Sequence, residues 1–178
     1  MEPQQNVGCG SGGSGLSIVV PAYNEARRLP GTLPRVIEYA SRLDEPAEII
    51  VVDDGSTDGT GDVAAAAARP CDPVVVLRSS PNRGKGAAVR QGMLAARFGH
   101  VLFTDVDLAY SFDDILRLAQ TLHAGAEVAI ASRSHPDSRL VLPPWLQGYA
   151  YRRHLQSLVY SALVRLLLPV TQRDTQAG

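Results

Sequence analysis

The chain has 178 residues, of which 45% are hydrophobic and 20% are charged, and its formal net charge is −1. This length suits one domain with a well-buried core, and the composition is ordinary for a globular protein. Because the net charge is close to zero, the chain has no general electrostatic attraction to nucleic acid. Any anion site must therefore be local, and no nucleic-acid partner is predicted.

Residues 1–15 are rich in Gly and Ser, which predicts a flexible leader before a domain over residues 16–178. They lack the basic start and apolar core of a signal peptide. No run of about 18 uncharged apolar residues occurs, so no transmembrane segment is predicted. Cys9 and Cys71 match no metal or redox spacing, which fits a reducing, cytoplasmic compartment. The histidines form no i, i+4 pair, so the sequence disfavours a zinc site.

Short apolar runs alternate with helical segments along the chain. The predicted strands are residues 16–20, 48–52, 73–77, 101–104 and 127–131. The predicted helices are residues 26–43, 60–68, 87–98 and 111–122. This alternation predicts an α/β fold with a Rossmann-like, doubly wound and mostly parallel sheet that has helices on both faces.

Some residues indicate where these elements begin and end. Pro21 is expected to end the first strand, because it has no N–H group for the ladder. Thr57 and Asp58 are expected to cap the second helix, and residues 111–114 the fourth. The first helix is expected to bury one face, formed by Leu29, Leu33, Val36, Ile37 and Tyr39.

The pattern changes after Ser132. Residues 133–147 hold three prolines and predict a loop. Residues 149–168 predict a helix that is basic at its start and apolar afterwards, which suits either contact with a membrane surface or packing in the core of the same domain. Because a domain rarely ends on a polar segment such as residues 172–176, the C-terminus is expected to be incomplete.

Acidic residues follow two predicted strands, Asp53 and Asp54 after the second, Asp105 and Asp107 after the fourth. The carboxyl ends of parallel strands form the edge at which open α/β sheets bind ligands. Alternate residues of an extended chain point the same way, so Asp105 and Asp107 are expected to direct both carboxylates at one Mg²⁺ or Mn²⁺ ion. Such an ion keeps open positions for a diphosphate. The alternative is that these aspartates are turn residues or helix caps.

Other side chains at this edge suit a nucleotide. Lys85 lies between two glycines at a predicted helix start, where backbone N–H groups favour a phosphate, unless the segment is an ordinary surface turn. Tyr23 can stack on a base and Glu25 can accept from a base or ribose; loop packing and a helix N-terminal charge are their alternative roles. The motifs of P-loop ATPases and α/β-hydrolases are absent, and no G-x-G-x-x-G of dehydrogenases follows the first strand.

Four segments occur in the order and approximate spacing of family 2 glycosyltransferases, so the chain from residue 16 onward resembles that family and its GT-A fold. The segments are Val20-Pro21-Ala22-Tyr23-Asn24-Glu25, Val52-Asp53-Asp54-Gly55-Ser56-Thr57-Asp58, Gly84-Lys85-Gly86-Ala87 and Asp105-Val106-Asp107. Two more segments resemble its polyprenyl-phosphate branch, which includes dolichyl-phosphate glucosyl- and mannosyltransferases. They are Ala131-Ser132-Arg133 and Arg173-Asp174-Thr175-Gln176-Ala177-Gly178.

The resemblance implies a metal-dependent, inverting hexosyltransferase. Its donor would be a nucleotide-sugar of the UDP-glucose or GDP-mannose type, and its acceptor a polyprenyl or dolichyl phosphate at the cytoplasmic face of a membrane. The residues implied to bind the donor are Pro21, Tyr23, Glu25, Val52, Asp53, Asp54, Lys85, Asp105 and Val106. Those implied to bind the acceptor phosphate are Arg133, Arg153 and Ser157. Asp105 and Asp107 are implied to hold Mg²⁺ or Mn²⁺, and the implied catalytic residues are Asp107, Arg133 and Asp174.

Two features depart from the branch. Ala109 stands where mannosyltransferase relatives often carry Gln, and Ala177 stands where their ending often has Cys. Two alternatives to the function that the resemblance implies stay open. One is a family 2 enzyme that acts on a polysaccharide or a small acceptor, and the other is a truncated domain that binds nucleotide without turnover.

Overall fold

The computed structural model describes residues 13–69, 72–108 and 111–131. The chain divides into two compact units, residues 1–126 and 127–178, and every described helix and strand lies in the first. The prediction of one domain over residues 16–178 stays a prediction. Residues 1–12 of the predicted leader lie outside the described residues.

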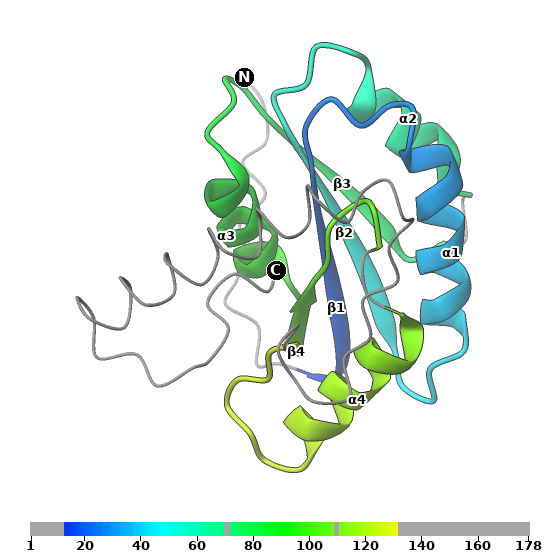
Figure 1. The fold of residues 1–178 in the computed structure, drawn as a ribbon, viewed down its shortest axis with the longest axis vertical. Coiled ribbons are helices and arrows are strands. Elements are labelled where there is room, and N and C mark those ends of the chain that lie inside the picture. Colours follow the sequence, from blue (N-terminus) through cyan, green and yellow to red (C-terminus); the bar gives the residue numbers. More distant parts are fainter. Residues whose placement is uncertain (1–12, 70–71, 109–110, 132–178) are drawn as a thin grey trace, which may run out of the picture. The chain divides into compact units, whose positions relative to one another are not determined.

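The sheet of the first unit has four parallel strands in the order β3-β2-β1-β4 (Figure 1). These strands are β1 (Gly13–Ala22), β2 (Ala47–Asp54), β3 (Val74–Ser79) and β4 (Phe98–Phe103). The helices are α1 (Leu29–Ser41), α2 (Thr60–Ala67), α3 (Lys85–Ala95) and α4 (Phe112–His123). Since β2 and β4 flank β1, the strand order reverses between β1 and β4, and such switch points are where open α/β sheets bind ligands.

Helices cover both faces of this sheet. Ile49 and Val51 of β2 belong to the core under α1, α2 and α4, whereas Ile50 and Val52 belong to the core under α3. Neighbouring residues of a strand point to opposite faces, so a continuous apolar run is buried on both sides. Figure 1 shows α3 on the opposite side of the sheet from α1 and α2. The prediction of a doubly wound, parallel α/β fold is confirmed.

The prediction that Pro21 ends the first strand is wrong, because β1 continues to Ala22. The N–H of Thr104 donates to the carbonyl of Val19, so the backbone N–H and C=O groups of Val19 face β4. Because residues two apart in a strand direct these groups to the same side, the backbone of Pro21 also faces the β4 side. Pairing with β4 ends at Val19 opposite Phe103, while pairing with β2 continues to Ala22. The N–H group that Pro21 lacks would therefore face no paired strand, and the proline is tolerated.

β1 also begins earlier than predicted, since residues 13–15 of the predicted leader belong to it. Gly13 pairs with Phe98 of β4, so strand pairing overrides the flexible composition. Gly15 has a φ of 151°, and a Cβ atom there would lie 2.5 Å from the carbonyl oxygen of Pro46. Only glycine fits such a close approach to the loop before β2 without a local shift.

One predicted strand and the end of one predicted helix are wrong, because tertiary contacts decide both. Residues 127–131 form no strand; Val128 is 78% exposed, and no pairing of this segment occurs within the described part of the chain. A strand depends on a neighbour for its hydrogen bonds. The third helix ends at Ala95, and Phe98 begins β4. The N–H groups of Arg97 and Phe98 donate to the side chains of Glu48 and Ser17 instead of continuing the helix.

Two local predictions are confirmed. The Ser111 hydroxyl accepts from the N–H of Asp114, and the Asp114 carboxylate accepts from the N–H of Ser111, which makes a capping box at α4. Helix α1 buries four of the five predicted side chains, and the fifth, Ile37, is partly buried. Among the described residues, no helix has the length and hydropathy needed to cross a bilayer.

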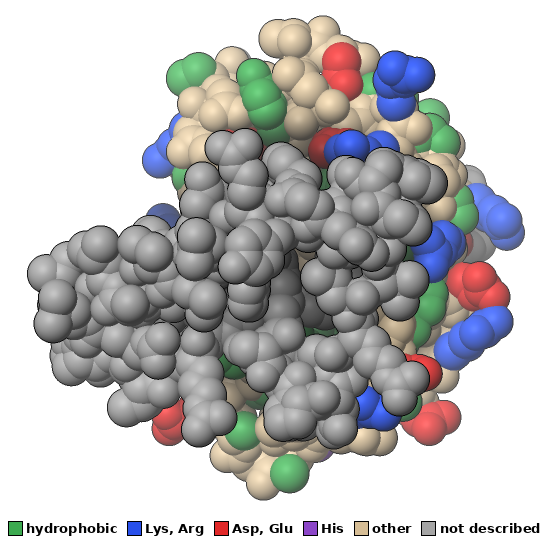
Figure 2. Space-filling model, in the orientation of Figure 1, with side chains coloured by type: hydrophobic (Ala, Val, Ile, Leu, Met, Phe, Trp, Pro, Cys, Tyr) green, Lys and Arg blue, Asp and Glu red, His purple; other side chains and the backbone are tan. Residues whose placement is uncertain are grey.

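Acidic and basic side chains are interspersed on the surface beside α1 (Figure 2). Glu38 pairs with Arg42 there, and Glu25 pairs with Arg28 just before the helix. Exposed pairs of this kind contribute little to stability. As far as the described residues show, this side carries no continuous basic surface, in agreement with the near-neutral net charge.

A buried carboxylate joins three segments at the amino-terminal end of the sheet. Glu48 of β2 is 1% exposed and accepts bonds of 2.7 Å from the Ser17 hydroxyl, the Arg97 N–H and the Arg97 Nε. Burial alone would raise the pKa of Glu48, but the bonds from the Arg97 backbone, Ser17 and the Arg97 guanidinium outweigh it and hold the pKa below its ordinary value.

We expect Glu48→Gln to lower the free energy of unfolding by about 1–3 kcal/mol at pH 7, since the charge-assisted bonds are lost. A carboxyl group whose pKa is lower in the folded state stabilises the fold above its unfolded pKa, and this contribution is lost as pH falls through the folded pKa. Urea denaturation of parent and variant at pH 7 and at about pH 3 measures the difference. A stability gap that stays constant between the two pH values would contradict the assignment.

Candidate functional site

A cleft of about 470 Å³ opens at the carboxyl-terminal end of the strands in the first unit. The residues of this cleft that the sequence analysis singled out are Pro21, Tyr23, Glu25, Asp54, Lys85, Asp105, Val106 and Asp107. Five residues to which it assigned no role complete the lining: Ala22, Arg28, Asn82, Gly84 and Ala88. Most of these five lie inside or beside the quoted motifs, and this proximity was the only sequence feature that could have identified them as cleft residues.

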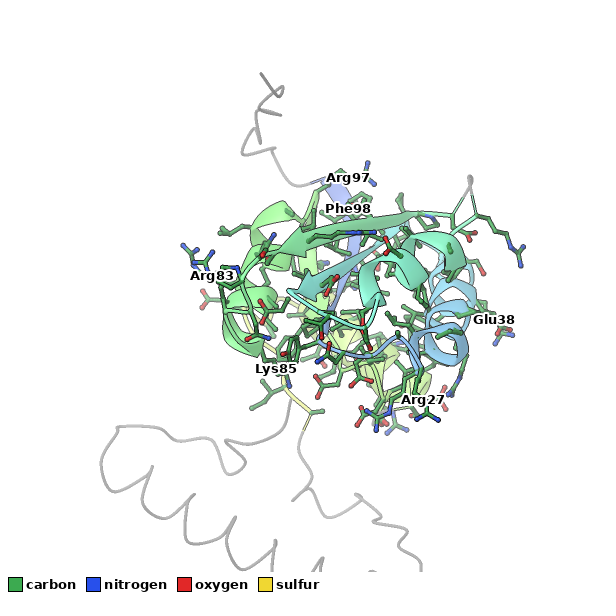
Figure 3. All side chains as sticks on the ribbon, turned by 90° about the horizontal axis from the view of Figure 1, so that it is seen from above. Arg27, Glu38, Arg83, Lys85, Arg97 and Phe98 are labelled. Atoms are coloured by element: carbon green, nitrogen blue, oxygen red, sulfur yellow. The ribbon has the colours of Figure 1, made fainter. Side chains whose placement is uncertain are left out.

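A second hollow, of about 380 Å³, lies near Glu48 and Arg97 at the amino-terminal end of the strands. Its Glu48 carboxylate is already occupied by three donors. Lys85 of the first cleft and Arg97 of the second hollow lie on opposite sides of the first unit (Figure 3). Most of the described site residues that the sequence analysis singled out line the larger cleft.

The two adjacent aspartates at the end of β2 point to opposite faces of the sheet. Asp53 is 7% exposed; its Oδ1 accepts from the N–H of Ser56, and its Oδ2 lies where a side chain on Gly61 of α2 would collide. Asp54 points to the α3 face and lines the cleft. Val52 is fully buried under α3. Of the predicted donor-binding residues, Val52 and Asp53 therefore lie behind the cleft and not on its surface.

Asp54 holds the loop that leads into α3. It is 3% exposed, its Oδ1 accepts from the N–H of Arg83 at 3.0 Å, and its Oδ2 accepts from the N–H of Gly84 at 2.7 Å. Gly84 is the N-cap of α3 and Lys85 is the first helical residue. The carboxylate thus fixes the position of Lys85 at the edge of the cleft.

The loop after β1 is joined to the loop after β2 by side chains from both. The N–H groups of Asn24 and Glu25 donate to the hydroxyls of Ser56 and Thr60, and the N–H of Thr57 donates to Asn24 Oδ1. Asn24 has a φ of 54°, a left-handed conformation that asparagine tolerates better than most residues. These bonds delay the start of α1 to Leu29, three residues later than predicted.

Asp58 contributes to the same junction, and its carboxylate accepts from the orphan N–H of Thr60 at the start of α2, as predicted, although Asp58 is not the N-cap. The N-cap of α2 is Gly59, with a φ of 83°, and Thr57 bonds to Asn24 instead of capping the helix. Asp58 accepts from the N–H groups of Thr60 and Ala26. The Thr60 hydroxyl and these backbone groups hold the pKa of Asp58 below its ordinary value. A charged Asp58 therefore connects the two loops.

Asp105 and Asp107 lie in a turn and not in extended chain. The N–H of Leu108 donates to the carbonyl of Asp105 at 3.1 Å, and Leu108 has a φ of 47°. The Val106 side chain is buried in the core, and its carbonyl accepts from the Thr32 hydroxyl of α1 at 2.8 Å. The extended-chain argument was wrong, yet both aspartates line the same cleft because Val106 anchors the turn between them.

Among the described residues, ion pairs at the cleft join Lys85 to Asp105 and Arg28 to Glu25. Lys85 Nζ is 2.9 Å from Asp105 Oδ1 and 3.1 Å from its Oδ2. Arg28 Nη1 lies 3.0 and 3.1 Å from the two Glu25 oxygens. Tyr23 is 49% exposed, so its ring is accessible to a ligand. Each ion pair keeps a cation beside a carboxylate in the cleft.

The donor set fits a hard divalent cation. The lining holds the carboxylates of Glu25, Asp54, Asp105 and Asp107 against the cations Arg28 and Lys85. Asp54 is occupied by backbone donors and Glu25 by Arg28. Asp105 and Asp107 line the cleft from one turn, and carboxylate oxygens suit Mg²⁺ or Mn²⁺ better than softer metals.

The predicted acceptor and catalytic residues of the C-terminal segment cannot be placed in this cleft. They lie outside the described residues, together with the predicted helix at residues 149–168. These residues are Arg133, Arg153, Ser157 and Asp174.

Comparison with known proteins covers most of the chain. The model of glycosyl transferase family 2 matches residues 17–171. The chain is 36% identical over 176 residues to a dolichyl-phosphate beta-glucosyltransferase of Drosophila melanogaster, covering 92% of this chain and 52% of that protein. It is 34% identical over 166 residues to a polyprenol monophosphomannose synthase of Mycolicibacterium smegmatis, covering 90% and 58%. The chain spans about half the length of the curated relatives it matches.

Solved structures with a similar fold include a mannosyltransferase of Pyrobaculum calidifontis in complex with GDP-Man and Mn²⁺. The similarity has a TM-score of 0.52 at 29% sequence identity, and covers 60% of this chain and 32% of that chain. The likeness extends from the sequence to the arrangement of strands and helices.

Proposed function

The chain belongs to glycosyl transferase family 2, and from this premise we propose that it transfers a hexose from a nucleotide-sugar to a polyprenyl phosphate. Its fold is of the GT-A type that the sequence resemblance implied. The observation that carries the proposal is the cleft at the carboxyl-terminal edge, where a turn bearing Asp105 and Asp107 faces Lys85, Tyr23 and Glu25.

The donor is proposed to occupy this cleft. The exposed ring of Tyr23 is available to stack on the base, and Glu25 to accept a hydrogen bond from base or ribose. Lys85, at the N-terminus of α3, is placed to bind a phosphate, where the helix dipole adds to its charge. Val52 and Asp53 support this surface from behind through the core and the Ser56 turn.

Asp105 and Asp107 are proposed to hold Mg²⁺ or Mn²⁺. A bound divalent ion offsets negative charge on the leaving nucleoside diphosphate. Lys85, now paired with Asp105, is positioned to turn from that carboxylate to a donor phosphate. The core-packed Val106 keeps the two aspartates in one turn, so they present their oxygens without further ordering of the backbone.

The acceptor is proposed to be a polyprenyl phosphate at the cytoplasmic face of a membrane. Its phosphate oxygen attacks the anomeric carbon, the bond from that carbon to the nucleoside diphosphate breaks, and the configuration inverts. A phosphate is already anionic near pH 7, so it requires positioning more than a general base. By resemblance, Arg133, Arg153 and Ser157 hold it, and Asp174 is proposed to orient it. The basic start and apolar remainder of residues 149–168 support their contact with the membrane. The dolichyl-phosphate and polyprenol relatives support this acceptor class.

A thermal-shift measurement with UDP-glucose and GDP-mannose, each with and without Mn²⁺, tests the donor site. A specific ligand at 100 times its Kd stabilises the folded state by about 2.7 kcal/mol. We expect one donor to raise the melting midpoint in a Mn²⁺-dependent manner and the other to have a smaller effect. No shift with either donor would contradict the proposed pocket.

Transfer to a polyprenyl phosphate is then measured with the donor that binds. Sugar transfer to the lipid but not to a water-soluble acceptor supports the proposed function. Binding without turnover would favour a nucleotide-binding domain, and transfer to a polysaccharide or small acceptor would favour the other family 2 alternative.

A further inference from the structure

Three metal-ligating side chains meet at the amino-terminal end of the sheet, away from the cleft. Glu45 comes from the loop before β2, His100 from β4, and His123 from the last position of α4. One ligand atom of each lies within 4.8 Å of the others. Glu45 Oε2 is 3.3 Å from His123 Nε2, and the two imidazole rings are 4.5 Å apart in an edge-on arrangement.

We propose that Glu45, His100 and His123 bind a zinc-type divalent metal ion. Two imidazole nitrogens and one carboxylate form a common three-ligand zinc set, with a fourth position left for water or another ligand. At metal–ligand distances of about 2.0–2.1 Å, ligand atoms of a tetrahedral zinc lie about 3.3 Å apart. Glu45 and His123 already have this separation, and the third ligand needs to approach by at most about 1.5 Å.

His123 is oriented for this role by a second contact. Its Nδ1 lies 2.8 Å from the carbonyl oxygen of Ala119, one turn earlier in α4. In the neutral ring this makes Nδ1 the donor and leaves the lone pair of Nε2 facing Glu45. Histidines that ligate metals usually donate their other ring N–H to such a carbonyl or carboxylate, which fixes the tautomer and the ring orientation.

The surroundings also favour a cation. The Glu45 side chain is only 18% exposed, and its charge, after burial, contributes to the raised pKa of the Tyr39 hydroxyl. A divalent ion would offset the Glu45 charge and join the loop before β2, β4 and the end of α4. Its effect is therefore expected on stability and not on sugar transfer.

This cluster differs from the cleft in the metal it selects. Imidazole ligands suit zinc, whereas the oxygen-only set of Asp105 and Asp107 suits Mg²⁺ or Mn²⁺. The sequence disfavoured a zinc site because the histidines are not paired at i, i+4. His100 and His123 lie on different elements, so only the packing of α4 against β4 brings them together.

The test is calorimetric titration of the chelator-treated chain with Zn²⁺, in millimolar Mg²⁺ that occupies the oxygen site. We expect one equivalent to bind and to raise the melting midpoint. His100→Asn, His123→Asn and Glu45→Gln should each weaken binding at least about tenfold. Asp44→Asn, an exposed carboxylate beside Glu45, is the matched control and should bind as the parent does.

Co²⁺ provides a second measurement, because tetrahedral coordination by nitrogen and oxygen gives intense visible absorption bands. These bands should appear with the parent and with Asp44→Asn, and be lost with His123→Asn, whose exposed side chain can be replaced without loss of folding. Metal-free melting midpoints establish that each variant is folded. No Zn²⁺ binding by the parent, or equal binding by all variants, would overturn the proposal.

Discussion

Replacing Asp107 by Asn is expected to reduce sugar transfer at saturating Mn²⁺ by at least about 100-fold. Asp107 lines the cleft on the same turn as Asp105, and its side chain is proposed to supply one of two carboxylates to the metal. An amide carries no charge and binds a hard divalent ion more weakly. The Mn²⁺-dependent part of the nucleotide-sugar affinity, measured by calorimetry, should fall with the transfer rate.

Asp113→Asn is the control for this variant. Asp113 is an exposed acidic residue in the first turn of α4 and does not line the cleft. Its replacement should leave transfer and metal dependence unchanged. Because Asp113 is exposed, this control should stay within about 0.5 kcal/mol of the parent in unfolding free energy. Transfer by Asp107→Asn within twofold of the parent would exclude the metal role.

Replacing Asp54 by Ala is expected to lower the free energy of unfolding by about 3–5 kcal/mol. The buried Asp54 carboxylate accepts from two backbone N–H groups, those of Arg83 and Gly84. Hydrogen bonds to a charged group each contribute about 1.5–3 kcal/mol, and donors left buried without an acceptor carry a desolvation penalty. The loop that positions Lys85 would also open, so donor affinity should decrease together with stability.

Substitutions of two other aspartates test whether the loss of stability is specific to Asp54 or follows the removal of any carboxylate. Asp53→Ala removes one backbone acceptor contact, to the N–H of Ser56, and should cost about half as much. Asp44→Ala changes an exposed residue and should have an effect within about 0.5 kcal/mol. Urea denaturation of the three variants measures the order. If Asp54→Ala were no more destabilising than Asp44→Ala, the role of Asp54 in holding the α3 loop would be wrong.

The site shows how far a motif can predict geometry. The apolar run Ile49 to Val52, followed by Asp53 and Asp54, identified a strand whose end lies at the ligand-binding edge, because a strand buried on both faces is apolar along its length. The sequence treated Asp53 and Asp54 as one pair. In the sheet they diverge, since neighbouring strand residues point to opposite faces. Asp54 thereby supports the α3 loop, while Asp53 forms the turn toward α2.

For the Asp105–Asp107 segment, by contrast, the predicted location was right and the predicted backbone conformation was wrong. The sequence argument reached the right cleft from a wrong local conformation, because the segment is a turn and not a strand. The turn is decided by contacts distant in sequence, namely the Thr32 hydroxyl on the Val106 carbonyl and the burial of the Val106 side chain. A pattern of residue types contains no information on which distant donor will bind that carbonyl.

The sequence by itself determined the alternation of strands and helices, the parallel sheet and the edge that bears the cleft. The alternation, the sheet and its edge could be predicted because they depend on hydrophobic periodicity and capping residues, which act over a few neighbouring residues. Only the tertiary structure decided where Phe98 leaves the helix, which way each aspartate points, and that His100 and His123 meet. These features depend on hydrogen bonds and packing between distant segments, which exist only when the sheet and its helices have assembled.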